Sequence, residues 1–294
     1  MVRYVAYILV TLIALALAGS VAVLLGQGVV DCLAGPPPVH LTVFDGVGAV
    51  GGHPPRIRAV FGGPGDRRPL DAYWAVVRFP DGWTQWAYVS RLGRCRPTGP
   101  ADLPPGSHRF QVSLPETHPR LDVRARGTAW IRPREAPVVW VDARSLVPEA
   151  LAGPHADASA VARPPETVLA AVDVLKTLAG SRRPVYLVEA DAERYDRIRR
   201  RLQQWGAPAG PAFWVTPDRP YGRLKGLIGV WPQVRGAVIA SDDLAHAAER
   251  LKVPVARVPS AGETAGGTPA PADAWRRALH RLTSLSSTNS NPRR

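Results

Sequence analysis

Between residues 39 and 133, apolar and polar residues alternate along short segments. Segments such as "VHLTVFD", "AYWAVVRF" and "SHRFQVSL" are rich in β-branched and aromatic residues and are bounded by Gly, Pro and Asp. In the last of them, Phe110, Val112 and Leu114 alternate with polar neighbours, which is typical of a strand with one buried face. Six runs of this kind predict an all-β sandwich domain.

Two further details of this stretch concern a turn and the core. Asp81-Gly82 supplies a hairpin turn between two strand-like runs. Trp74, Trp86 and Trp130 lie within strand-like runs. We expect these three side chains to form the core of the sandwich rather than a surface on which ligands stack.

The pattern changes after Pro137. Continuous apolar runs such as "VVWVD" and "PVYLVEA" alternate with segments of helical spacing, in one of which Val168, Val172 and Leu175 share a face. Apolar strands separated by amphipathic helices indicate a parallel sheet covered on both faces. Residues 136–258 are therefore predicted to form a doubly wound α/β domain.

The last 36 residues, 259–294, read as three pieces. "PSAGETAGGTPAPAD" is typical of a flexible linker. A short basic helix is predicted next, with Trp275, Leu279 and Leu282 facing inward. The polar end, "TSLSSTNSNPRR", is predicted to be a disordered tail.

The start of the chain, residues 1–33, is predicted to be a membrane anchor. Tyr4–Leu25 contains no charged residue over 22 positions, long enough to span a bilayer as a helix. A cleaved signal peptide is the alternative, since small residues at Ala16 and Ala18 offer a cleavage site. We favour an uncleaved anchor because the apolar run continues to Leu25.

The flanking charges predict the orientation of this anchor. Arg3 precedes the apolar segment, and the next basic residue after it is Arg56. We therefore expect a single-pass protein of the cell membrane, with a cytoplasmic N-terminus and extracytoplasmic domains. In that compartment Cys32 and Cys95 can form a disulfide, although two separate thiols are also compatible with the sequence.

Composition limits the classes of partner. Apolar residues make up 46% of the chain and charged residues 21%, which excludes wholesale disorder. The net charge is +13, and arginine supplies all but three of the basic residues. This excess reflects either biased composition or attraction to anionic lipids or phosphorylated ligands. No basic run with interleaved aromatics marks a nucleic-acid surface, so we expect no nucleic-acid partner; the lipid bilayer is the expected partner of the anchor.

Polar residues follow several of the predicted parallel strands. Such sheets bind ligands at the carboxyl ends of their strands. Asp142, Glu189, Thr216 and Ser241–Asp243 are therefore candidates for one shared crevice.

The order of these elements resembles the haloacid dehalogenase-like (HAD) hydrolase superfamily, with a weaker similarity to its lipin-like phosphatidate phosphatase branch. The resemblance implies that Asp142, at the end of "VVWVD", is a nucleophile. It implies that Lys225 steadies a phosphoryl group, and that Asp242 and Asp243 hold Mg²⁺ together with Asp142. The expected fold class is α/β: a HAD-like doubly wound sheet preceded by an all-β sandwich and an N-terminal transmembrane helix.

Two departures from the family pattern argue against efficient hydrolysis. Arg144 stands where the family has an acid/base aspartate, and arginine stays protonated near neutral pH. Glu189 stands where a hydroxyl residue contacts the phosphoryl group and would repel phosphate. Arg144 is expected to bridge Asp142 and either Glu189 or Asp242, which removes the need for a metal. We therefore expect a non-catalytic, membrane-anchored binding or scaffolding module without a cofactor; the alternative is a Mg²⁺-dependent phosphohydrolase acting on phosphorylated lipids or small phosphate esters.

Overall fold

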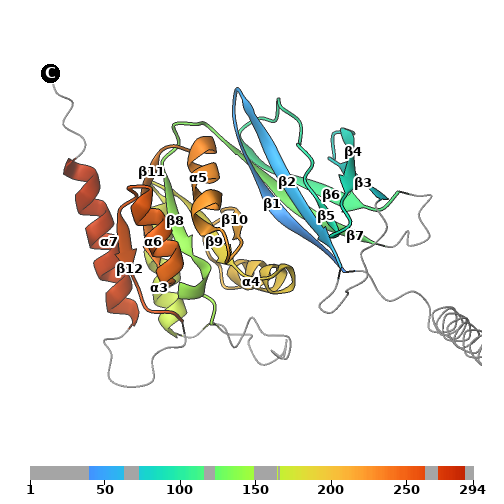
Figure 1. Ribbon diagram of the computed structural model, residues 1–294. Coiled ribbons are helices and arrows are strands. Elements are labelled where there is room, and N and C mark those ends of the chain that lie inside the picture. Colours follow the sequence, from blue (N-terminus) through green and yellow to red (C-terminus); the bar gives the residue numbers. More distant parts are fainter. Residues whose placement is uncertain are drawn as a thin grey trace, which may run out of the picture. The chain divides into compact units, whose positions relative to one another are not determined.

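The computed structural model describes residues 40–62, 73–115, 123–148, 164, 166–261 and 271–288. These residues all belong to one compact unit, which begins at His40 (Figure 1). The predicted anchor, Tyr4–Leu25, lies outside the described residues, as does Cys32. None of the helices in the described part of the chain has the length and apolar character needed to cross a membrane.

The first sheet is built from the alternating segments. Its strands are β1 (Leu41–Ala49), β2 (His53–Phe61), β3 (Tyr73–Arg78), β4 (Thr84–Val89), β5 (Arg94–Cys95), β6 (Gly106–Ser113) and β7 (Arg124–Arg132). They pair in the order β4-β3-β6-β7-β1-β2-β5. Five of the six pairings are antiparallel, whereas β1 pairs with β7 in parallel. The two edge strands, β4 and β5, also contact each other, so the sheet almost closes into a barrel.

The predicted fold class is wrong in its overall form. The described residues form one mixed, nearly closed sheet where a two-sheet sandwich was expected, and they contain no membrane-spanning helix. The physical reason lies in strand pairing. Alternation identifies a strand and its buried face, but it does not say which strands are neighbours. Here the parallel pairing of β1 with β7 joins the hairpins into a single sheet.

The expected tryptophan core is also wrong for two of the three residues. Trp74 is 52% exposed and Trp86 is 57% exposed. Both lie on the β3–β4 hairpin, where Trp74 is paired with Tyr88, which is also half-exposed. Alternation fixes two faces of a strand, and the aromatic residues here occupy the outer one. The core side of the hairpin carries smaller residues such as Ala75 and Val77.

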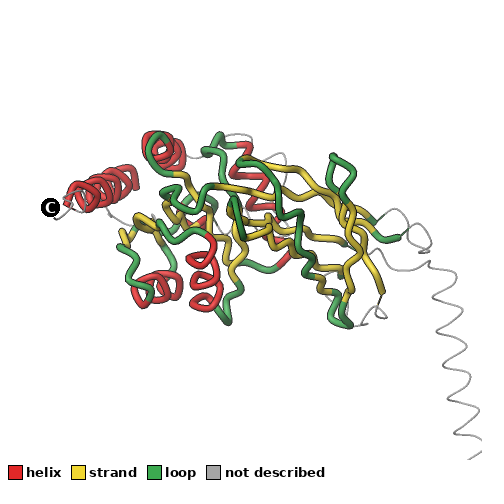
Figure 2. Tube along the Cα trace, turned by 90° about the horizontal axis from the view of Figure 1, so that it is seen from above, coloured by secondary structure: helices red, strands yellow, loops and turns green. Residues whose placement is uncertain are grey.

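The second sheet consists of five parallel strands. They are β8 (Val138–Asp142), β9 (Arg183–Glu189), β10 (Ala212–Val215), β11 (Val234–Ile239) and β12 (Val255–Arg257), in the order β10-β9-β8-β11-β12. Helices cover both faces (Figures 1 and 2). The helices are α3 (Glu166–Ala179), α4 (Ala192–Gln204), α5 (Pro220–Val230), α6 (Asp242–Arg250) and α7 (Pro271–Thr288).

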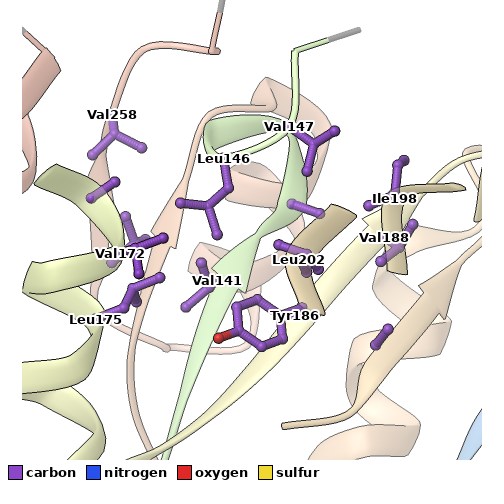
Figure 3. Packing of buried hydrophobic residues seen from close by; sticks show 14 of the residues in the cluster. Val141, Leu146, Val147, Val172, Leu175, Tyr186, Val188, Ile198, Leu202 and Val258 are labelled. Carbon is purple, nitrogen blue, oxygen red and sulfur yellow. The ribbon is translucent and has the colours of Figure 1, made fainter. Parts of the chain in front are cut away.

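The two faces of β8 carry separate cores. Val139 and Val141 pack with apolar residues of α3, α4 and α7, whereas Val138 and Trp140 pack with residues of α5 and α6. Figure 3 shows the first of these cores, in which Val141 lies among side chains from the neighbouring helices and strands. Because both faces are buried, the strand sequence is continuously apolar up to Asp142.

Strand β1 belongs to both parts of the fold. Its register with β2 shifts between Phe44 and Val47, which reverses the alternation of side chains along β1. Phe44 before the shift and Val47 after it therefore both face the parallel domain. Phe44 stacks on Trp214 with a centroid distance of 4.1 Å, and Val47 joins the core beneath α5 and α6. Trp231, which follows α5, donates its indole N–H to the carbonyl of Gly48 at 3.0 Å. The strand is therefore buried along almost its whole length.

The C-terminal helix is longer than the sequence indicates. It runs to Thr288, into the segment predicted as a disordered tail. Trp275 and Leu282 are buried, and Leu279 packs partly against the same core. Arg182 donates a hydrogen bond of 3.0 Å to the carbonyl of Leu282. These contacts confirm the inward face predicted for Trp275, Leu279 and Leu282.

Candidate functional site

Asp142 ends β8 and is fully buried. One carboxylate oxygen accepts a hydrogen bond from the backbone N–H of Arg144 at 3.0 Å. The other accepts from the N–H groups of Ala240 and Ser241 at 3.1 and 2.8 Å. Burial raises the pKa of Asp142, and these three donors oppose that rise. The carboxylate therefore ties the end of β8 to the end of β11, and both of its oxygens accept from backbone donors.

Ser241 links this aspartate to Glu189, at the end of β9. Its backbone N–H binds Asp142, and its hydroxyl donates to Glu189 Oε2 at 3.0 Å. The same hydroxyl accepts from the N–H of Leu244 and so caps α6. A serine is suited to this place because one hydroxyl both donates and accepts.

Arg144 neutralises Glu189. Its guanidinium lies 3.5 Å from Glu189 Oε2, with the arginine side chain 40% exposed and the glutamate side chain 2% exposed. Burial raises the pKa of Glu189, and the charge of Arg144 opposes that rise. The Arg144 guanidinium was expected to bridge Asp142 and either Glu189 or Asp242. It pairs with Glu189, whereas Asp142 binds the backbone N–H of Arg144 and Asp242 pairs with Arg257.

The structure brings Asp142, Glu189, Ser241 and Arg144 together, but it leaves the other candidates apart. Asp242 and Asp243 are exposed in the first turn of α6. No group of three or more His, Cys, Asp or Glu residues in the described ranges is placed to hold a metal ion. The family-implied metal set therefore does not assemble around Asp142.

Lys225 and Thr216 lie away from that crevice. Lys225 is exposed on α5. Thr216 follows β10 and lines a separate cavity, whose wall contains neither Asp142 nor Glu189.

The predicted disulfide stays a prediction. Cys95 is buried on β5, where burial raises the pKa of its thiol to about 11. Its proposed partner, Cys32, is outside the described residues.

The cavity beside Thr216 is a feature that sequence analysis missed. It has a volume of about 360 Å³ and lies where β2 and β5 meet β10 and the start of α5. Its charged lining residues are Arg58, Arg94, Arg96, Asp218, Arg219 and Arg223. The motifs "RIR" and "RCR" carry a signal that could have found it, because residues two apart on a strand share a face. The pairing of β2 with β5 then brings these arginines together.

A second feature missed from the sequence is the buried carboxylate of Asp45 on β1. It accepts hydrogen bonds from the guanidinium of Arg199 at 2.9 Å, the N–H of Ala212 at 3.0 Å and the indole of Trp130 at 3.3 Å. The hydroxyl of Tyr195 accepts a hydrogen bond from the N–H of Asp45 and donates to the carbonyl of Ala212. This network fastens β1 to β10 and α4, so we assign it a structural role.

Comparisons with known proteins do not assign the chain to a family. No family model matches the chain, and no curated protein matches it. Among solved structures, a carbohydrate acetylesterase from Xanthomonas citri aligns over 87% of this chain and 76% of its own, with 13% identity and a TM-score of 0.33. Similarity at this level does not establish a shared fold or activity.

The predicted description of the chain as a HAD-like, phosphatase-like membrane protein with a β-sandwich needs correction. No family model and no curated protein supports the predicted HAD-like and phosphatase-like character, so we do not carry it further. The sandwich is replaced by the mixed sheet, and the described residues provide no membrane helix.

Proposed function

We propose that the chain from His40 onward is a non-catalytic binding module. The observation that carries this proposal is that Asp142 is buried, with both carboxylate oxygens bound to backbone N–H groups. A nucleophilic carboxylate needs an oxygen that faces the substrate, whereas both oxygens of this buried side chain face backbone N–H groups. The carboxylate at the end of β8 serves to join two strands.

The neighbouring groups support the same conclusion. Proton transfer near neutral pH needs a group that exchanges protons in that range, and arginine, as at Arg144, does not. Glu189 is engaged by Ser241 and Arg144. The crevice therefore contains neither a free general acid nor an accessible nucleophile among the predicted residues.

A hydrolysis assay tests this proposal. The purified full chain is incubated with Mg²⁺ and p-nitrophenyl phosphate, and with a phosphorylated lipid in detergent. We expect phosphate release equal to that of a buffer control. The matched variant is Asp142→Asn, which removes the charge and keeps the shape. Turnover by the wild type that Asp142→Asn abolishes would overturn the proposal, provided that the variant melts cooperatively.

A further inference from the structure

The arginine-lined cavity contains an excess of positive charge. Five arginines and one aspartate, Asp218, contribute to its wall. Asp218 lies 3.8 Å from Arg219, and both of these side chains are largely exposed. Arg58, Arg94 and Arg96 have no ion pair with a carboxylate anywhere in the described ranges. Four positive charges thus remain without a counter-charge in the wall.

Arg223 has a fixed orientation within this wall. Its Nε and one terminal nitrogen both donate to the carbonyl of Trp214, at 3.0 and 2.6 Å. The guanidinium also lies over the ring of Phe213, 4.7 Å from its centroid. These neutral contacts hold the arginine at the cavity and leave its charge uncompensated.

Burial and repulsion from neighbouring arginines both act on Arg58 and Arg223. Burial lowers the pKa of Arg223, and the charges of Arg58 and Arg96 lower it further. Burial also lowers the pKa of Arg58, with smaller contributions from Arg96, Arg56 and Arg94. In contrast, the partly buried Arg199 has Asp45 as its partner. Neither Arg58 nor Arg223 has a carboxylate partner of this kind in the described ranges.

We propose that this cavity binds a phosphate-type oxyanion. Guanidinium groups match phosphate oxygens with paired, charge-assisted hydrogen bonds. The volume of about 360 Å³ falls in the range of small-molecule sites. Gly222, in the first turn of α5, lines the cavity and has open space where a side chain would stand. A carboxylate brings one negative charge, whereas a phosphate monoester or diphosphate brings two or more. A phosphate therefore balances the excess positive charge of the cavity wall better. The proposal rests on the module binding its ligand without converting it.

A titration with small phosphates tests the site. The melting temperature and heat of binding of the full chain are measured with inorganic phosphate, pyrophosphate or glycerol 3-phosphate, against potassium chloride at equal ionic strength. The test variants are Arg58→Gln and Arg96→Gln. The matched control is Arg109→Gln, which makes the same charge change at an exposed position on β6, outside the cavity wall.

We expect phosphate to raise the melting temperature of the wild type and of Arg109→Gln. Each cavity variant should bind about tenfold more weakly or worse, as for a lost hydrogen bond to a charged group. Without phosphate, Arg58→Gln should have a melting temperature no lower than that of the wild type, because the substitution relieves repulsion between the arginines. If Arg58 had a structural role, the substitution would lower the melting temperature. Preference for glycerol 3-phosphate identifies an organic ester such as a lipid headgroup, and preference for inorganic phosphate or pyrophosphate identifies a free oxyanion.

Two results would overturn the cavity proposal. One is a wild type that phosphate does not stabilise beyond chloride. The other is equal weakening in Arg109→Gln and in the cavity variants, which would mean attraction to net charge alone. Hydrolysis that depends on Asp142 is a separate failure: it would remove the non-catalytic function and leave the dependence of binding on Arg58 unchanged.

Discussion

Replacing Asp45 with alanine should be among the most damaging single changes in this protein. The substitution removes a carboxylate whose side chain is 5% exposed, beside an arginine that is 20% exposed. It leaves the guanidinium of Arg199 without its partner at 2.9 Å and the backbone N–H of Ala212 without an acceptor. The remaining Arg199 contact in the first sheet is one hydrogen bond to the carbonyl of Arg126.

The expected loss is large because a buried charge loses its partner. Breaking a buried pair by removing one member typically costs about 3–5 kcal/mol of unfolding free energy. For a chain of this size each kcal/mol lowers the melting temperature by about 2–4 °C. We therefore expect Asp45→Ala to melt roughly 6–20 °C below the wild type.

Urea unfolding and thermal melts measure this effect, and a double-mutant cycle assigns it. Asp45→Ala, Arg199→Met and the double variant are compared; the double variant should be more stable than the sum of the single losses predicts. The control is Asp173→Ala, which breaks an exposed pair with Lys176 and should cost at most about 1 kcal/mol. A loss below about 1 kcal/mol for Asp45→Ala, or single losses that add to within about 0.5 kcal/mol, would refute a buried ionic link.

Further predictions concern pH, one turn and one ion pair. Because burial raises the pKa of Glu189, its carboxyl group stays protonated to higher pH in the folded state than in the unfolded state, so stability should fall as the pH rises above about 4.3. Urea titrations across pH 4–7 should show a weaker fall in Glu189→Gln. A profile in this variant equal to that of the wild type would contradict the assignment. Gly93 has a φ of 68°, and an added Cβ would meet the carbonyl oxygen of Phe61. Gly93→Ala should therefore lower the unfolding free energy by about 1–3 kcal/mol. A melting temperature equal to that of the wild type would exclude this strain. Arg144→Ala should cost only about 1 kcal/mol in urea unfolding, because the arginine is 40% exposed and Glu189, whose pKa burial raises, can take up a proton when the arginine is removed. A loss above about 3 kcal/mol would mean that the buried Glu189 stays charged and depends on Arg144.

The candidate crevice could be predicted because the rule behind it is local. Parallel strands end at one edge of a sheet, so the polar residues at or just after the ends of β8, β9 and β11 had to lie near one another. Asp142, Glu189 and Ser241 do so. Asp242 does not join this group, because Ser241 caps α6 and the two aspartates that follow it point outward in the first helical turn.

The features that were missed depend on pairings between distant residues. Asp45 and Arg199 are 154 positions apart, and neither is unusual within its own segment. The arginine-lined cavity arises only when β5 pairs with β2 and both approach α5. The expected sandwich failed for the same reason, since local alternation cannot reveal that β1 lies beside β7.

The position of β1 has a consequence for how the protein can be divided. A boundary near residue 134 would separate Phe44 from Trp214 and Gly48 from Trp231. A fragment that ends there would expose the apolar residues of β1. A fragment that starts there would lack β1, whose Phe44 and Val47 belong to the cores of the parallel sheet. Calorimetry of the intact chain should accordingly show one heat-absorption peak whose van't Hoff enthalpy equals the calorimetric enthalpy, and fragments cut at this point should aggregate.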